Sequence, residues 1–340
     1  MIKKFSTALL GAVAAVGLAS AASAGTLDDV KAKGFVQCGS NTGLAGFAIP
    51  DASGNWTGLD VDFCRAVAAA IFNDATKVKF TPLSAKDRFT ALQSGEIDLL
   101  SRNTTWTMSR DTSLGLKFAG VNYYDGQGFM IRKSLGVTSA LQLAGASVCT
   151  QTGTTTELNV ADFFRANNLK YEVVTFEKSD EVVKAYDAGR CDVFTTDASG
   201  LYAERLKLTN PDDHVVLPEI ISKEPLGPLV RQGDDSWFNV VKWVHYAMIN
   251  AEELGLTKAN VDEKMKSTTN PEIKRFVGAE GKFGEGIGLS NAWAYQIVKL
   301  VGNYGESFEA NVGVNTRLKI ARGQNALWTK GGLQYAPPIR

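Results

Sequence analysis

Short apolar runs alternate with helical patterns over the first two thirds of the chain. The apolar runs predict buried strands at 36–38, 78–81, 97–101, 148–150, 173–176 and 193–195. Apolar residues at three- and four-residue spacing predict helices between them, at 61–72, 86–94, 157–167 and 180–188, and a long helix follows at 236–254. Strands that alternate with helices are typical of parallel sheets, and the pattern occurs twice. We therefore predict an α/β fold with two parallel-sheet lobes.

An internal repeat supports this division. Residues 91–100 and 185–194 both read as a helix, a glycine that can take the left-handed cap conformation, and an aspartate that opens a buried strand. Each strand then ends in a polar cluster, and open parallel sheets bind ligands at the carboxyl ends of their strands. The repeat predicts two lobes with Arg110 and Asp197 across one cleft. The alternative is that two similar short segments arose by chance.

The most informative stretch is 98–110, where a buried strand turns into short polar side chains and then delivers Arg110. A guanidinium suits a carboxylate because its planar fork donates two parallel charge-assisted hydrogen bonds. The stretch therefore predicts a site for a small polar anion. The alternative is an ordinary strand exit with a solvated arginine.

A second polar stretch, 148–157, runs from a strand through Gly153 to Thr154 and Thr155 at the start of a helix. Free backbone N–H groups and the positive end of the helix dipole favour an anion there. Thr154 with Glu157 could also form a simple capping box, and the two interpretations are compatible. No Gly-Lys-Ser/Thr follows, so this is not a phosphate loop.

The first 24 residues read as a signal peptide, with Lys3 and Lys4, a short apolar run and a small-residue cleavage site at 22–24. No other stretch has the ~20 continuous apolar residues of a membrane span. The remaining 316 residues are enough for two domains and carry 34 basic and 36 acidic residues, a net charge of −2. That balance argues against nucleic acid as a partner.

Four cysteines in an exported chain are expected to form disulfides. Spacing does not separate the three possible pairings. We favour Cys38 with Cys64 and Cys149 with Cys191, because each pair then closes within one lobe. There is no Cys-x-x-Cys motif and the chain has two histidines, so we expect no metal site and no cofactor.

Four motifs, at 58–63, 97–110, 151–155 and 192–197, carry a resemblance to a known family. In their sequence and their order along the chain, they resemble periplasmic solute-binding proteins for polar amino acids, the capture components of ABC importers. The resemblance covers 27 to about 256, and 101–107 with the extended C-terminus is similar to the branch that binds L-amino acids broadly.

The resemblance implies a periplasmic-binding-protein fold of type II, with two lobes joined by two crossing strands. Lobe 1 would comprise 25–131 and 226–340, with a C-terminal extension from about 260, and lobe 2 would comprise 132–225. We predict that 129–132 is the first crossing strand. The implied partners are L-amino acids and an inner-membrane ABC permease with its ATPase, and we expect a periplasmic monomer.

The resemblance also implies roles for single residues. Arg110 would bind the ligand α-carboxylate and Asp197 the α-ammonium. Thr105 and the backbone near Asn103 would hold both groups, and Thr155 would donate a further hydrogen bond to the carboxylate. Together these residues would grip a zwitterion.

Two departures from narrow-specificity relatives predict a roomy side-chain pocket. The loop 42–46 lacks the aromatic residue found in relatives, and Ala85 replaces a larger wall residue. The apolar wall is left open between three candidates, Leu44, Phe47 and Trp106.

Two further questions stay open. Arg102 could meet acidic ligand side chains or form an ion pair behind the site. Besides transport, the fold allows a cleft enzyme of the cyclohexadienyl dehydratase type or an amino-acid sensor without a transporter.

Overall fold

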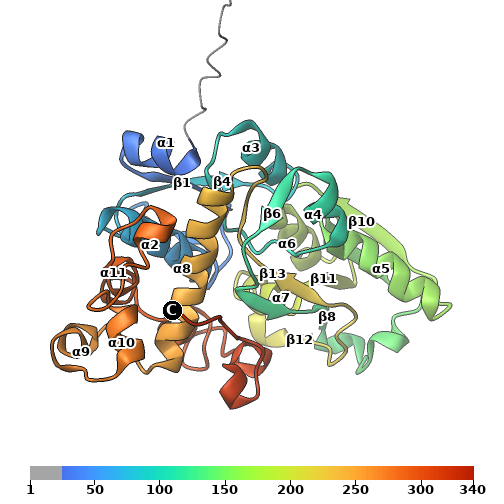
Figure 1. Cartoon of the computed structure of the whole chain (residues 1–340). Coiled ribbons are helices and arrows are strands. Elements are labelled where there is room, and N and C mark those ends of the chain that lie inside the picture. The colour runs from blue at the N-terminus through green and yellow to red at the C-terminus, as the bar shows by residue number, and fades with distance from the viewer. Residues whose placement is uncertain (1–24) are drawn as a thin grey trace, which may run out of the picture.

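The computed structural model describes residues 25–340, so the predicted signal peptide lies outside the described residues. Two lobes of sheet and helix lie side by side in Figure 1, with α8 and the C-terminal helices on the side of the first lobe. No helix within 25–340 has the length and apolar character needed to cross a membrane.

The first lobe is built on a five-stranded sheet. Its order is β4 (Val78–Leu83), β1 (Val36–Asn41), β5 (Leu99–Leu100), β14 (Leu229–Arg231) and β6 (Leu116–Phe118). The pairs of β1 with β4 and β5 are parallel, and β14 is antiparallel to both of its neighbours. The helices before residue 115 are α1 (Thr26–Lys33), α2 (Leu59–Phe72), α3 (Arg88–Ser94) and α4 (Met108–Ser113). A small hairpin, β2 (Ile49–Pro50) with β3 (Trp56–Thr57), precedes α2.

The second lobe repeats this plan. Its sheet runs β10 (Glu172–Phe176), β9 (Ser147–Gln151), β11 (Val193–Asp197), β8 (Gln127–Arg132) and β12 (His214–Val216). Strand β9 is parallel to β10 and β11, and β8 is antiparallel to β11. The helices are α5 (Thr155–Ala166), α6 (Ser179–Asp187) and α7 (Ala198–Arg205). Every strand and helix predicted from the sequence is confirmed, with ends shifted by a few residues.

The internal repeat is structural, not a chance similarity. Gly95 and Gly189 both have φ of 81°. Gly95 is the C-cap of α3, before β5, and Gly189 follows Ala188, the C-cap of α6, before β11. The aspartate of each copy accepts a hydrogen bond from a backbone N–H near the start of a neighbouring strand: Asp98 Oδ2 from Gln37 of β1 at 2.7 Å, and Asp192 Oδ2 from Ser147 of β9 at 2.9 Å. The two copies therefore fix β5 to β1 and β11 to β9 in the same way.

Two short antiparallel strands, β7 (Tyr123–Asp125) and β13 (Glu224–Leu226), form the crossing between the lobes. Residues 129–132, expected to be the first crossing, instead lie in β8 of the second sheet. Residues 127–131 of β8 are fully buried, and the strand pairs with β11 and β12, so its apolar sequence reflects a core strand rather than a connection. The lobe limits 25–131, 132–225 and 226–340 remain proposals.

The chain after β14 returns to the first lobe. Helix α8 (Asp235–Glu253) and helices α9 (Val261–Ser267), α10 (Pro271–Phe276), α11 (Trp293–Leu300) and α12 (Tyr304–Asn311) share one apolar core with α2. The extension also reaches the first crossing strand. The Asn325 side chain accepts from the Tyr124 N–H at 2.7 Å and donates to the Tyr124 carbonyl at 3.0 Å, and the Tyr304 hydroxyl donates to the Asn122 carbonyl at 2.9 Å.

Both predicted disulfides are present. Cys38 on β1 is bonded to Cys64 on α2, and Cys149 on β9 is bonded to Cys191 just before β11. The first bridge ties α2 to β1 and the second ties the start of β11 to β9, so each bridge is confined to its own lobe.

Candidate ligand-binding site

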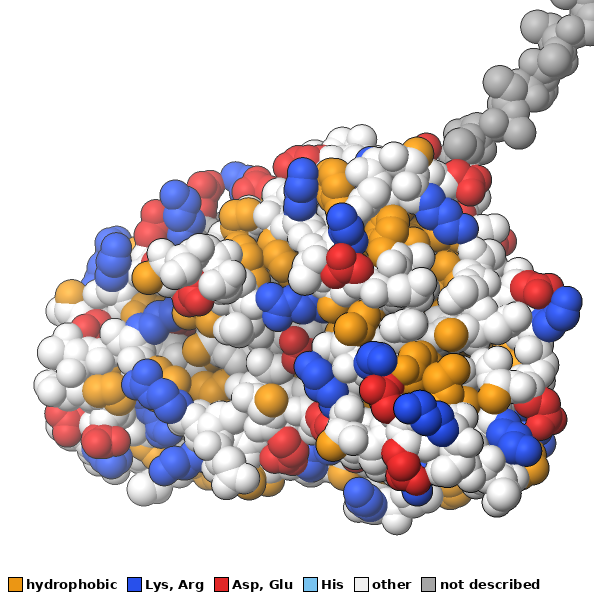
Figure 2. All heavy atoms as spheres, turned by 90° about the vertical axis from the view of Figure 1, so that its left-hand side faces the viewer, with side chains coloured by type: hydrophobic (Ala, Val, Ile, Leu, Met, Phe, Trp, Pro, Cys, Tyr) orange, Lys and Arg blue, Asp and Glu red, His pale blue; other side chains and the backbone are white. Residues whose placement is uncertain are grey.

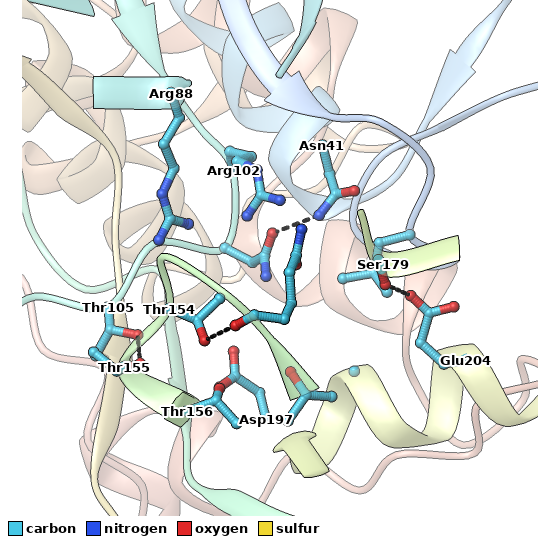
Figure 3. Close-up of a pocket in the computed structure, with 15 residues that line it drawn as sticks. Asn41, Arg88, Arg102, Thr105, Thr154, Thr155, Thr156, Ser179, Asp197 and Glu204 are labelled. Carbon is cyan, nitrogen blue, oxygen red and sulfur yellow. Dashed lines mark hydrogen bonds between the residues drawn. The ribbon is translucent and has the colours of Figure 1, made fainter. Parts of the chain in front are cut away.

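A cavity lies between the lobes, and the ends of the parallel strands supply most of its lining. Asn41 ends β1, Arg102 follows β5, and Asp197 ends β11. Figure 3 shows Arg88 and Arg102 on one side of the cavity and the threonines and Asp197 on the other. The complete lining is Asn41, Leu44, Arg88, Arg102, Asn103, Thr105, Gln151, Thr154, Thr155, Thr156, Ser179, Thr196, Asp197, Gly200 and Glu204.

Two buried arginines form the lobe-1 wall. Arg102 donates from Nε to the Leu83 carbonyl at 3.1 Å, and Arg88 donates from Nη1 to the Thr104 hydroxyl at 3.3 Å. The buried Arg88 Nε has no hydrogen-bond partner among the described residues. Burial lowers the pKa of Arg102 to about 10 and holds the pKa of Arg88 well below its usual value. Both guanidiniums thus have donors left over for an anion in the cavity.

Asp197 forms the opposite, lobe-2 wall. It is 7% exposed, and within residues 25–340 its carboxylate accepts no hydrogen bond. Burial, followed by the charges of Asp125 and Glu224, raises its pKa well above the usual value, while Arg88 and Arg110 oppose the shift. An unpaired buried carboxylate is costly, and a cationic group in the cavity would offset that cost.

The structure places Arg110 beside the cavity rather than on its lining. Its Nη1 donates to the Thr105 carbonyl at 2.9 Å, and its backbone N–H donates to the Thr107 side chain, which caps α4. Burial lowers the Arg110 pKa, while the charges of Glu224 and Asp197 raise it. Arg110 therefore contributes to the electrostatic potential in the cavity, and its binding of a ligand carboxylate remains a proposal.

The two predicted threonines come together across the lobes. The hydroxyl oxygens of Thr105 and Thr155 lie 3.4 Å apart, and both donate to Glu224 Oε2, at 2.6 and 2.9 Å. Thr154 is the N-cap of α5 and accepts from the Glu157 N–H. The Glu157 side chain accepts from Gly153 instead of the cap residue, so a full capping box is not formed.

The side chain of Asn103 lies at the cavity, whereas its backbone N–H points elsewhere. That N–H donates to Asp60 Oδ2 at 2.8 Å, and the residue has a left-handed φ of 32°. The Asn103 side chain accepts from Asn41 at 2.9 Å. The backbone donor expected near Asn103 is thus committed to the buried Asp60.

Of the three candidates for the apolar wall, Leu44 lines the cavity. Phe47 is buried against Tyr123, with ring centroids 5.1 Å apart, and Trp106 stacks on Phe118 outside the cavity at 5.2 Å. Ala85 is buried and does not line the cavity. The Ala85 backbone lies close to Gly153 of the other lobe. A role of Ala85 in widening the pocket remains a proposal.

The lobes also touch at the rim of the cavity. Lys86 of the first lobe forms an ion pair with Glu177 of the second at 3.0 Å, and Lys207 of the second lobe donates to the Gly43 carbonyl at 2.8 Å. With the threonine pair inside, these contacts define a closed arrangement of the lobes.

Sequence reasoning missed several lining residues. Arg88 begins the helix after β4, and Ser179 begins the helix after β10, so the rule that ligands bind at carboxyl strand ends could have found both. Asn41, Gln151 and Thr196 lie at or near strand ends for the same reason. Glu204 lies on α7, where it accepts from Ser179 at 2.5 Å, and no local pattern indicated it. Among the described residues, no group of three metal-ligating side chains is found.

Comparisons with known proteins agree with this architecture. Residues 36–258 match the family described as bacterial extracellular solute-binding proteins, family 3. The general L-amino acid-binding periplasmic protein AapJ of Rhizobium johnstonii is 68% identical over 340 residues, which is 99% of each chain. The glutamate/glutamine/aspartate/asparagine-binding protein BztA of Rhodobacter capsulatus is 58% identical over 335 residues, 98% of this chain and 99% of BztA.

A solved structure matches as closely. It is an ABC transporter periplasmic binding protein from Brucella ovis with glutathione bound, 66% identical, with a TM-score of 0.92. The match covers 93% of this chain and all of the other. The two-lobed fold, the cavity between the lobes and these relatives lead to one conclusion: the chain belongs to the bacterial extracellular solute-binding proteins, family 3.

Proposed function

We propose that this protein binds L-amino acids with broad specificity in the periplasm and delivers them to an ABC importer of the inner membrane. The observation that carries the proposal is the opposition of charges across the cavity, with Arg88 and Arg102 on one wall and Asp197 on the other. A zwitterion supplies one charge for each wall. The names of AapJ and BztA support the same ligand class.

Because the lobe-1 wall carries two arginines, Arg88 and Arg102, we also propose ligands with a second carboxylate. A ligand α-carboxylate would satisfy part of the cationic field of Arg88, Arg102 and Arg110, and a side-chain carboxylate would satisfy more. Glutathione, bound in the Brucella ovis relative, carries two carboxylates and one α-ammonium. We therefore include acidic amino acids and small acidic peptides among the proposed ligands.

Calorimetry tests the proposal on the mature protein after its ligand has been removed by unfolding and refolding. The titration panel contains the common L-amino acids, D-glutamate and glutathione. Several chemically different L-amino acids should bind, and D-glutamate should bind more weakly than L-glutamate because a three-point grip is chiral. Binding of a single amino acid would contradict broad specificity, and binding of none would contradict the function.

The Arg88→Met variant tests the acidic preference in the same panel. It should weaken glutamate at least tenfold more than alanine, since only glutamate has a second carboxylate. Lys77→Met is the matched control, because Lys77 is exposed and directly precedes β4 in the same lobe. Equal losses for glutamate and alanine in Arg88→Met would contradict the assignment.

The cleft-enzyme alternative finds no support in the relatives, which are binding proteins of transporters. We propose that the protein is not an enzyme, since Arg88, Arg102 and Asp197 each have a role in holding a zwitterion and Glu204 accepts a hydrogen bond from Ser179. An amino-acid panel incubated with the protein should be recovered unchanged.

A further inference from the structure

A buried carboxylate behind the cavity controls the two threonines that face it. Glu224 lies on the second crossing strand, β13, and is 1% exposed. Its Oε2 accepts from the hydroxyls of Thr105, in lobe 1, and Thr155, at the start of α5 in lobe 2, at 2.6 and 2.9 Å. Its Oε1 accepts from Asn159 Nδ2 at 2.6 Å and from the Ser222 hydroxyl at 2.7 Å. Glu224 itself does not line the cavity.

The proton count fixes the direction of these hydrogen bonds. An ionised carboxylate can only accept, and a threonine hydroxyl has one proton to donate. Thr105 and Thr155 therefore each donate their only hydroxyl proton to Glu224. Since both residues also line the cavity, the hydroxyls present only lone pairs toward a ligand.

We propose that Glu224 is a positioning residue that makes this cleft selective for an α-ammonium. By holding both hydroxyl protons, it turns Thr105 and Thr155 into obligatory acceptors. A protonated amine has three donors and satisfies these acceptors together with Asp197. A 2-hydroxy acid has one donor, so it leaves an acceptor unsatisfied, and a buried group without its partner costs affinity.

This inference rests on the proposed function and revises one expected role. Thr155 cannot donate its hydroxyl proton to the ligand carboxylate while that proton is bound by Glu224. Any donor to the carboxylate from this corner must be a backbone N–H of the α5 N-terminus or one of the arginines.

The test compares two ligands that differ in a single group, L-glutamate and (S)-2-hydroxyglutarate. We define the amine preference as the ratio of their dissociation constants, measured by calorimetry with the ligand-free protein. Glu224→Met removes the acceptor at nearly constant size and frees both hydroxyl protons. The amine preference should fall at least tenfold, because a freed proton opposes the ammonium and can serve the hydroxyl of the hydroxy acid.

Asn159→Leu is the matched control. It removes a hydrogen bond to the other Glu224 oxygen and leaves both threonines in place, so the amine preference should stay within about twofold of the wild type. A purely structural role for Glu224 would weaken both ligands by the same factor and leave the preference unchanged. That result would overturn the proposal.

Two further variants complete the design. Glu224→Asp keeps the charge but shortens the reach, so the preference should also fall there, which covers the case that Glu224→Met does not fold. In a Thr105→Val, Thr155→Val background, Glu224→Met should change the preference no further, and an undiminished effect would contradict a route through the hydroxyls. If the wild type binds no amino acid at all, the proposed function fails; if it binds glutamate and the preference survives every Glu224 variant, only this inference fails.

Discussion

Buried charged side chains that lack an ion-pair partner reduce the stability of the protein more than the other residues of the cavity do. Arg88, Arg102 and Asp197 are each less than 10% exposed, and within residues 25–340 none of them forms an ion pair. Breaking or omitting one half of a buried charge pair costs several kcal/mol. A ligand that supplies the missing halves recovers this free energy as affinity.

Asp197→Asn should weaken all amino acids by similar factors. The α-ammonium is common to every ligand, and loss of one partner of a desolvated charge pair costs about 2–5 kcal/mol, or roughly 30- to several-thousand-fold in affinity. Asp180→Asn, an exposed acid of the same lobe, is the control and should bind normally. Normal binding by a folded Asp197→Asn protein, checked by circular dichroism, would mean that the ammonium is held elsewhere.

Asp125, on the first crossing strand, should make stability depend on pH. Burial raises its pKa to about 6 from an ordinary value of 3.8, against the hydrogen bonds from Ser199 and Gly126. The folded state therefore binds the proton more tightly than the unfolded state, and the free energy of unfolding should fall as pH rises from about 4 to about 6. At 1.36 kcal/mol per unit, the change is on the order of 3 kcal/mol.

Urea unfolding at pH 4, 5, 6 and 7 measures this effect in the ligand-free protein. Asp125→Asn cannot titrate, so the stability of the variant relative to the wild type should rise over this range and level off above pH 6. Parallel pH profiles of the two proteins would contradict the assignment. Asp187→Asn serves as a control for a carboxylate outside the cleft.

Arg102 and Glu224 differ in how far their place at the site could be predicted from the sequence. Arg102 follows a strand whose apolar pattern is local, so its place at the cavity could be anticipated. Glu224 matters because Thr105 and Thr155, 119 and 69 residues away in the chain, converge on its carboxylate. Such convergence follows from the packing of the two lobes, and no local spacing encodes it.

The same distinction holds for whole elements. Strand and helix periods are local, and they predicted both sheets and the long helix α8. Strand β8 was mistaken for a crossing because a core strand buried on both faces has the same apolar sequence as a buried connection.

The C-terminal extension is the element that most affects the hinge. It lies beyond the residues matched by the family, 36–258, yet its Asn325 pairs with both backbone groups of Tyr124 on β7, as an additional strand would. The partner strand β13 occupies the other edge of β7. Figure 1 shows the red C-terminal segments beside α8, next to the crossing strands. The extension therefore braces the crossing from the side of lobe 1.

Asn325→Ala should lower the preference for the closed arrangement and weaken all ligands by a similar factor, no more than about tenfold, because only the part of the hydrogen-bond free energy that differs between the open and closed states affects binding. The ranking among ligands should not change, because Asn325 does not line the cavity. Calorimetry with alanine, glutamate and glutamine measures both quantities. Gln324→Ala, at an exposed neighbouring position, is the control. An unchanged affinity in Asn325→Ala would show that the hinge does not need the brace.

At the scale of the whole molecule, the crossing strands β7 and β13 join the two lobes, and Ala203 of α7 packs into the core of the first lobe. The interlobe contacts of Lys86 with Glu177 and of Lys207 with Gly43 lie at the rim, and the threonine pair lies inside. Basic and acidic side chains are interspersed over the face in Figure 2, so electrostatics over that face favours no single-sign partner. The contacts that hold the lobes in the closed arrangement therefore lie at the cleft and its rim.

Ligand should shift the molecule toward the closed arrangement, because a zwitterion that touches both walls binds the closed state better than the open one. Small-angle X-ray scattering of the ligand-free protein should give a larger radius of gyration than the same protein saturated with glutamate. Asp197→Asn should remain at the larger value at the same glutamate concentration. An identical radius with and without ligand in the wild type would contradict a closure mechanism.

The interrupted course of the chain through lobe 1 has a consequence for biogenesis. Strand β14 sits between β5 and β6 in the first sheet, so that sheet stays incomplete until residue 231 has crossed the membrane. The second sheet needs only residues 127–216, which emerge earlier and contain Cys149 and Cys191. During export, the second lobe can thus complete its sheet before the first lobe does. The first lobe must wait for β14 from the C-terminal half of the chain.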